Sequence, residues 1–150
     1  MSLQQWASNG WLRPHTTTRQ QIADLLAIAD RDLLDSARGD LSADWQFGIA
    51  YNAALKLCTI LLYASGYRPE KSLAHYRTLT ALPFTLGPGP ERRADADYLD
   101  TCRTKRNTAE YDLAGTVSQS EADELRDFAT ELRTDVIAWL KAEHPSLVAR

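Results

Sequence analysis

Residues 45–67 read WQFGIAYNAALKLCTILLYASGY and are apolar nearly throughout. This stretch predicts a helix that is apolar around its whole circumference, and such a helix must be covered by other elements on every side. Gln46, Asn52 and Lys56 interrupt it, and a lysine near the middle of a membrane span is energetically costly. We therefore expect a buried core helix rather than a transmembrane segment.

Further helices are predicted on both sides of this core helix. Their apolar residues recur at the i, i+3, i+4, i+7 spacing of one helical face, and no alternating strand pattern of useful length is present. The segment LPFTLGPGPERR is too rich in proline and glycine to be helical. The first helix is expected at about 18–37, with a Thr18–Gln21 capping box and an end at Gly39, and the core helix runs from Ser42 or Asp44 to Gly66. A turn at 66–71 leads to a short helix capped by Ser72, and a loop follows at about 82–91. The last two helices are expected at about 92–113 and from a Ser118–Glu121 capping box to about Glu143.

These elements predict an all-α fold, an up-and-down bundle of four long helices plus one short helix. The 150 residues suit one domain, which we divide into a lead-in segment at 1–17 and a single helical domain at 18–150. The bundle is expected to leave part of the core helix surface uncovered. We expect this surface to be covered by Trp6 and Trp11 of the lead-in or by a second copy of the chain. The lead-in lacks the features of a signal peptide, so we expect a cytoplasmic protein.

The composition and the cysteine pattern exclude several classes of protein. A formal charge of −3 with 44% hydrophobic residues excludes a disordered chain and a strongly basic nucleic-acid coat. Cys58 and Cys102 lie in apolar helical patterns and are interpreted as buried thiols. No CxxC pair or Cys/His cluster suggests zinc, and no nucleotide-cofactor motif occurs. We therefore expect neither a metal nor a cofactor.

Residues 103–112, RTKRNTAEYD, carry the strongest functional signal. Arg103, Lys105 and Arg106 place three cations within four residues. A plain interpretation is a solvated helix with pairs such as Arg106–Glu110. However, Arg106 shares a helical stripe with Leu99, Cys102 and Leu113, and an arginine on a buried face must pair, snorkel or line a cleft. A guanidinium in a cleft is suited to clamping phosphate.

Residues 18–143 resemble the HEPN family, small helical proteins named for higher eukaryotes and prokaryotes nucleotide-binding. The resemblance includes Arg106-Asn107, which matches the opening of the family signature in the helix before the last long one, and the start of the short helix at His75 (LAHYRTL). It implies a homodimer in which the signature helices flank a shared cleft. It also implies binding of RNA or a nucleotide by Arg103, Lys105, Arg106, Asn107 and Tyr111.

The chain departs from the family at the signature histidine. That residue would fall at 111–113, where the chain has Tyr111, Asp112 and Leu113. The resemblance implies metal-independent RNA cleavage, in which the arginine steadies the phosphate and the histidine moves protons. Tyrosine, with a pKa near 10, is a poor base at neutral pH. Arg106, Asn107 and Tyr111 remain the candidate catalytic residues, and Glu110 or Asp112 could act as acid or base.

We therefore expect a homodimer that binds nucleotide or RNA without efficient cleavage. The alternatives are a toxin-like endoribonuclease with altered acid and base residues, and a protein-interaction module without a nucleic-acid role. The resemblance also implies a toxin–antitoxin setting with a nucleotidyltransferase partner. Outside residues 103–112, we interpret His75 as a packing or hydrogen-bonding residue at the start of its helix.

Overall fold

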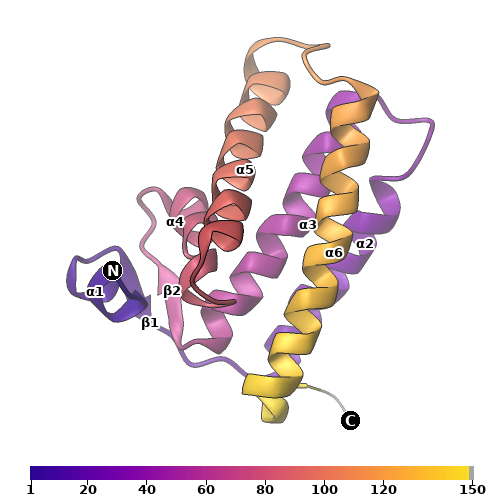
Figure 1. The fold of residues 1–150 in the computed structure, drawn as a ribbon. Coiled ribbons are helices and arrows are strands. Elements are labelled where there is room, and N and C mark those ends of the chain that lie inside the picture. The colour runs from indigo at the N-terminus through magenta and orange to yellow at the C-terminus, as the bar shows by residue number, and fades with distance from the viewer. Residues whose placement is uncertain (149–150) are drawn as a thin grey trace.

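The computed structural model of the protein describes residues 1–148 and is predominantly helical, as predicted (Figure 1). Its helices and strands are α1 (Leu3–Ser8), β1 (Leu12–Pro14), α2 (Arg19–Asp35), α3 (Ala43–Ala64), β2 (Tyr67–Pro69), α4 (Ala74–Thr80), α5 (Pro90–Asn107) and α6 (Gln119–Glu143). A 3-10 turn follows α4 at Leu82–Phe84, another follows α6 at Pro145–Leu147, and a π-helical turn extends α5 at Thr108–Asp112.

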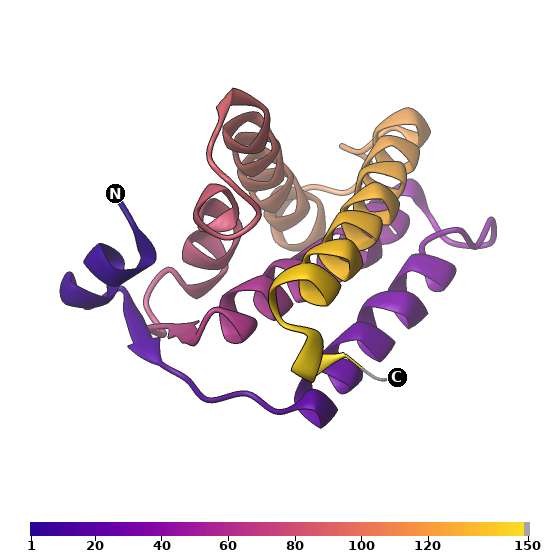
Figure 2. The same cartoon turned by 60° about the horizontal axis from the view of Figure 1, so that its bottom comes forward.

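The apolar helix α3 lies at the centre of the bundle. It packs along α2 and α6, while α4 and α5 cover another of its sides (Figures 1 and 2). Leu57, Ile60 and Leu61 are fully buried. By length and hydropathy alone α3 could cross a membrane, but 61% of its most apolar window is buried inside the bundle. Its burial therefore matches the predicted core helix.

The lead-in segment folds against one end of α3 and adds a small sheet. β1 pairs antiparallel with β2, so that Leu12 lies opposite Pro69. The all-α prediction did not include this pair, because strands of three residues are too short to display an alternating pattern. Trp6 is buried with Leu12 against Leu62 and Ala81. This contact covers part of α3, as expected from the lead-in tryptophans.

Helix starts with a local side-chain cap were predicted correctly. The hydroxyls of Thr18, Ser42 and Ser118 each accept a hydrogen bond from the third backbone N–H of their helix. Ser118 and Glu121 form the complete capping box. At Thr18 the box is incomplete, because the Gln21 side chain instead contacts residues that precede the helix.

Two expected boundaries in the first half of the chain were wrong. α2 ends at Asp35, before Gly39, because the buried amide of Gln46 donates to the Arg38 and Leu41 carbonyls and holds that segment outside the helix. α4 is not capped by Ser72. It begins after Leu73, whose left-handed backbone (φ 56°) sets the helix start without a side-chain cap.

The helix predicted at about 92–113 also differs at both ends. It starts at Pro90, which occupies the first helical turn, where its missing N–H costs nothing. The predicted loop therefore ends before residue 91. At the other end, α geometry stops at Asn107 and the π-helical turn follows. Cys102 of this helix and Cys58 of α3 are free and buried, and burial raises the pKa of each thiol to about 12.

Candidate functional site

A groove runs between the start of α3 and the end of α5. It encloses about 520 Å³, and a smaller hollow of about 110 Å³ that extends toward α2 shares Trp45, Gly48, Arg106 and Glu110 with it. Trp45 is 58% exposed on this side. We call this feature the α3–α5 groove; its lining residues are Ser42, Asp44, Trp45, Gly48, Arg106, Ala109, Glu110, Ala114 and Gly115.

The loop after the π-helical turn is tied to the start of α3 and forms one wall of the groove. The Asp44 carboxylate accepts hydrogen bonds from the backbone N–H groups of Gly115, at 2.7 Å, and Val117, at 3.3 Å. Asp44 was predicted as a possible helix cap, but Ser42 has that role. Because its carboxylate bridges α3 and the loop, Asp44 fixes the width of the groove at this end.

Arg106 lies across the floor of the groove with its side chain 23% exposed. Its Nη1 donates to the Asn107 side-chain oxygen at 3.1 Å, and its guanidinium carbon lies 5.5 Å from the centre of the Tyr51 ring. Its Nε lies 2.7 Å from a carboxylate oxygen of Glu110. The sequence predicted that Arg106 must pair, snorkel or line a cleft, and in the structure it both pairs and lines a cleft.

The ion pair with Glu110 leaves the hydrogen-bonding capacity of Arg106 incompletely used. Within residues 1–148, the buried Nε–H has no acceptor in hydrogen-bond geometry, although the Glu110 carboxylate is close. A buried donor without an acceptor is unfavourable. The nearby Glu110 carboxylate offsets this in part, and the remaining N–H groups of the guanidinium are the donors suited to a ligand anion.

The π-helical turn redirects the residues that follow Arg106. A π turn closes i→i+5 hydrogen bonds, seen here from Leu113 N–H to the Thr108 carbonyl at 2.8 Å. Each residue therefore advances less around the helix axis than in an α-helix. Leu113 consequently does not return to the buried stripe and is 63% exposed, which corrects its predicted place beside Leu99 and Cys102. Tyr111 is 70% exposed, with its ring centre 5.8 Å from the Arg106 guanidinium carbon.

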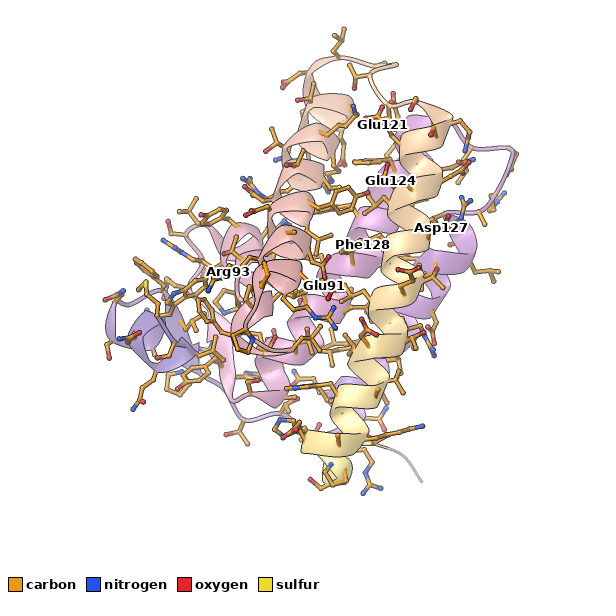
Figure 3. All side chains as sticks on the ribbon, in the orientation of Figure 1. Glu91, Arg93, Glu121, Glu124, Asp127 and Phe128 are labelled. Carbon is orange, nitrogen blue, oxygen red and sulfur yellow. The ribbon has the colours of Figure 1, made fainter. Side chains whose placement is uncertain are left out.

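The structure brings some of the predicted site residues together and separates others. Asn107, Glu110 and Tyr111 surround Arg106, whereas Asp112 is exposed on the π-helical turn. Lys105 points to the opposite side of α5, where it forms an ion pair with Glu121 of α6. Figure 3 labels Glu121 on the upper part of α6, across from α5. Lys105 therefore does not line the groove.

Arg103 lies one helical turn before Arg106, on the side of α5 that faces α4. Its guanidinium bonds to the Asp100 carboxylate at 2.8 Å and lies 5.7 Å from the centre of the Tyr76 ring. The site therefore continues from the groove toward α4. Sequence reasoning did not associate Trp45, Tyr51 or His75 with this site, because nothing in the spacing indicates which residues of three helices meet.

The charges of the molecule are distributed unevenly. A shallow hollow of about 480 Å³ on α6 is lined by Asp123, Glu124, Asp127 and Glu131. Figure 3 shows the labelled Glu124 and Asp127 along α6, and neither residue lines the α3–α5 groove. Carboxylates of one sign repel anions. The hollow on α6 therefore disfavours an anion, whereas the α3–α5 groove combines one arginine, Arg106, with the carboxylates of Asp44 and Glu110.

Within the described part of the chain, no group of three or more His, Cys, Asp or Glu side chains is placed to hold a metal ion. Comparison of the chain with protein-family models, with curated proteins and with solved structures finds no match. A function for the chain is therefore inferred from the geometry and charge of the groove.

Proposed function

We propose that this protein binds RNA or a nucleotide in the α3–α5 groove, as a HEPN-like homodimer. The observation that carries the proposal is Arg106, whose guanidinium lines the groove with Nη1 bonded to Asn107 and Nε paired with Glu110. A planar guanidinium matches two phosphate oxygens at once. The phosphate backbone of a nucleic acid is an anion of this geometry.

Two exposed aromatic rings beside Arg106 support a nucleic-acid ligand rather than a bare anion. Trp45 lines the groove, and Tyr111 lies at its edge on the π-helical turn. Proteins that bind single-stranded RNA combine cations for the backbone with aromatic rings on which bases stack, at about 1–3 kcal/mol per base. The groove offers both kinds of contact without sequence-specific readout.

The proposed homodimer is supported by the apolar residues around the same groove. Trp45, Tyr111 and Leu113 are all more than half exposed, and they belong to α3, the π-helical turn and the loop that follows. Clustered exposed apolar side chains are typical of interaction surfaces. A second copy related by a twofold axis would bury Leu113 at the rim of the groove and double the number of arginines at the cleft, while Trp45 and Tyr111 still face the ligand.

RNA cleavage is the second candidate and follows from the resemblance alone. Arg106 and Asn107 occupy the expected signature positions, but positions 111–113 hold no histidine. We expect binding to exceed cleavage for this reason. Incubation of the protein with a labelled RNA in EDTA tests the alternative, since cleavage lost in Arg106→Ala would assign an enzyme.

The binding proposal predicts that Arg106→Ala weakens the affinity for a fluorescein-labelled ten-nucleotide oligouridylate by about tenfold or more. Fluorescence anisotropy at two salt concentrations measures this, and the wild-type affinity should fall at the higher salt. Arg93→Ala is the matched control. It removes the same charge from an exposed position of the same helix, about 20 Å away at 1.5 Å per residue (Figure 3).

Equal affinities of the two variants would contradict the proposal for Arg106. Light scattering after gel filtration measures the mass of the wild-type protein. A monomer at tens of micromolar would contradict the homodimer while leaving binding by a single chain open to the anisotropy measurement.

A further inference from the structure

Tyr51 of α3 is surrounded by positively charged and titratable side chains from three helices. The guanidinium carbon of Arg106 lies 5.5 Å from its ring centre, and the His75 ring of α4 lies 6.4 Å away, centre to centre. Arg103 is close enough to act electrostatically on the Tyr51 hydroxyl. Because Arg106 also lines the α3–α5 groove, this cluster adjoins the groove on its α4 side.

The Tyr51 hydroxyl is the unusual member of this cluster. Tyr51 is 1% exposed, and its oxygen has no hydrogen-bond partner anywhere in residues 1–148. Buried tyrosine hydroxyls are normally hydrogen-bonded, because an unpaired one loses its bonds to water. Burial raises the pKa of Tyr51 to about 12, so the group keeps its proton and is a donor at neutral pH. An acceptor for this hydroxyl is missing among the described residues.

The charges around Tyr51 favour an anionic acceptor. Arg103 is paired with Asp100, and Arg106 with Glu110. Lys56 of α3, which also acts on His75, has no ion pair among the described residues. The cluster therefore retains an excess positive charge. A phosphate group can accept hydrogen bonds from several of these donors at once.

We propose that Tyr51, His75, Arg103 and Arg106 form a binding site for the phosphate group of a phosphate ester. The inference rests on the proposed function and deepens it, because it places the ligand's phosphate between α3, α4 and α5 and leaves the groove beside Trp45 for the base. The Tyr51 oxygen is covered in this structure. Binding therefore requires the long Arg106 side chain, which lies over the Tyr51 ring, to move aside so that a phosphate can reach the hydroxyl.

His75 makes the affinity of this site depend on pH. Burial, Arg106, Lys56 and Arg103 lower its pKa from the ordinary 6.5, so it is neutral at pH 7. The groups that face it are Tyr51 and Lys56 from α3 and Arg103 and Arg106 from α5. A bound anion stabilises the imidazolium form. The affinity for an anion therefore rises as the pH falls through the pKa of His75.

Tyr51→Phe is the decisive variant, because it removes only the oxygen. Since that oxygen has no partner in the protein, the variant should fold and be at least as resistant to urea as the wild type. Its affinity for inorganic phosphate, measured by titration calorimetry at pH 7, should fall about tenfold, whereas Tyr76→Phe, on the neighbouring ring, should keep the wild-type affinity. Unchanged phosphate affinity in folded Tyr51→Phe would overturn the proposal.

Sulfate serves as the probe of His75, because it does not titrate between pH 5 and 8. The wild type should bind sulfate more tightly at pH 5.5 than at pH 7.5, and His75→Gln should remove that difference. The same dependence in both proteins would overturn the role of His75.

The labelled oligouridylate separates the two proposals. RNA binding that is lost in Arg106→Ala but unchanged in Tyr51→Phe and His75→Gln overturns the phosphate site and leaves the proposed function standing. Phosphate binding that depends on Tyr51, in a protein that binds neither the oligouridylate nor a nucleoside monophosphate, supports the site and overturns the proposed function.

Discussion

Gly48 of α3 lines the groove together with Arg106. A Cβ placed on it would lie 4.0 Å from Arg106 Cγ, an ordinary van der Waals contact, and beyond its own helical turn no described atom would be closer. Its backbone is helical and lies outside the left-handed region that favours glycine. Glycine is therefore not required here by backbone conformation, although a large side chain would enter the groove.

Gly48→Ala should consequently raise the free energy of unfolding by up to about 1 kcal/mol, because alanine loses less backbone entropy in a helix. Urea denaturation measures this, and RNA affinity should stay at the wild-type value. Gly48→Phe should instead fill the groove and weaken RNA binding. A clear loss of stability in Gly48→Ala would mean that Arg106 packs more tightly on α3 than its contacts indicate.

At the scale of elements, helix starts are the best-predicted feature of the chain. Ser118 and Glu121 satisfy two backbone N–H groups reciprocally at the start of α6, the longest helix of residues 1–148. Such an interaction depends on four consecutive residues, so their identity is enough to predict it.

Ser118→Ala should lower the free energy of unfolding by about 1 kcal/mol, because the third N–H of α6 loses its acceptor. The control is Ser120→Ala, in the exposed first turn of the same helix. Thermal and urea unfolding compare the two variants. Equal stability would show that water replaces the cap at no cost.

Features that depend on distant partners were predicted less well. The early end of α2 depends on Gln46, which lies in another helix. The β1–β2 pair joins segments about 55 residues apart, each too short to show a pattern. The π-helical turn moved Leu113 to the surface, since an ideal 3.6-residue period had been assumed. Local chemistry predicted the elements, whereas tertiary contacts determined their ends.

For the whole molecule, the same distinction applies to the site. Arg106 and its neighbours in sequence were identified from the sequence alone. A charged side chain on an otherwise apolar helical stripe is unfavourable unless it is paired or lines a cleft, and this pattern is visible within a few turns of one helix. Tyr51 and His75 were not, since they lie 55 and 31 positions before Arg106 on other helices and meet it only in the folded bundle. Lys105 was misplaced, because its partner Glu121 belongs to α6.

The pKa shifts across the molecule predict that it loses stability in acid. The pKa of Glu121 is lowered by its hydrogen bond with Lys105, that of Asp123 by Gln119, and that of His75 by burial. A group with a lowered pKa in the folded state binds more protons when the chain unfolds. Its contribution to stability is present above its unfolded pKa and is lost as the pH falls.

Urea unfolding at several pH values should therefore show two steps. The first lies just below pH 6.5, from His75, and the second below about pH 4.5, from the carboxylates. His75→Gln should remove the first step and retain the second. Stability that rises between pH 7 and 5 would contradict the direction of these shifts.

The burial of Cys58 and Cys102 also has a kinetic consequence. Only a thiolate attacks an alkylating or oxidising reagent, and both sulfurs are covered and hold their protons far above neutral pH. They react only during excursions in which the helices separate. The rate at which a small alkylating agent modifies the two thiols therefore reports the rate of spontaneous opening of the bundle. This modification rate should fall when a ligand bridges α3 and α5.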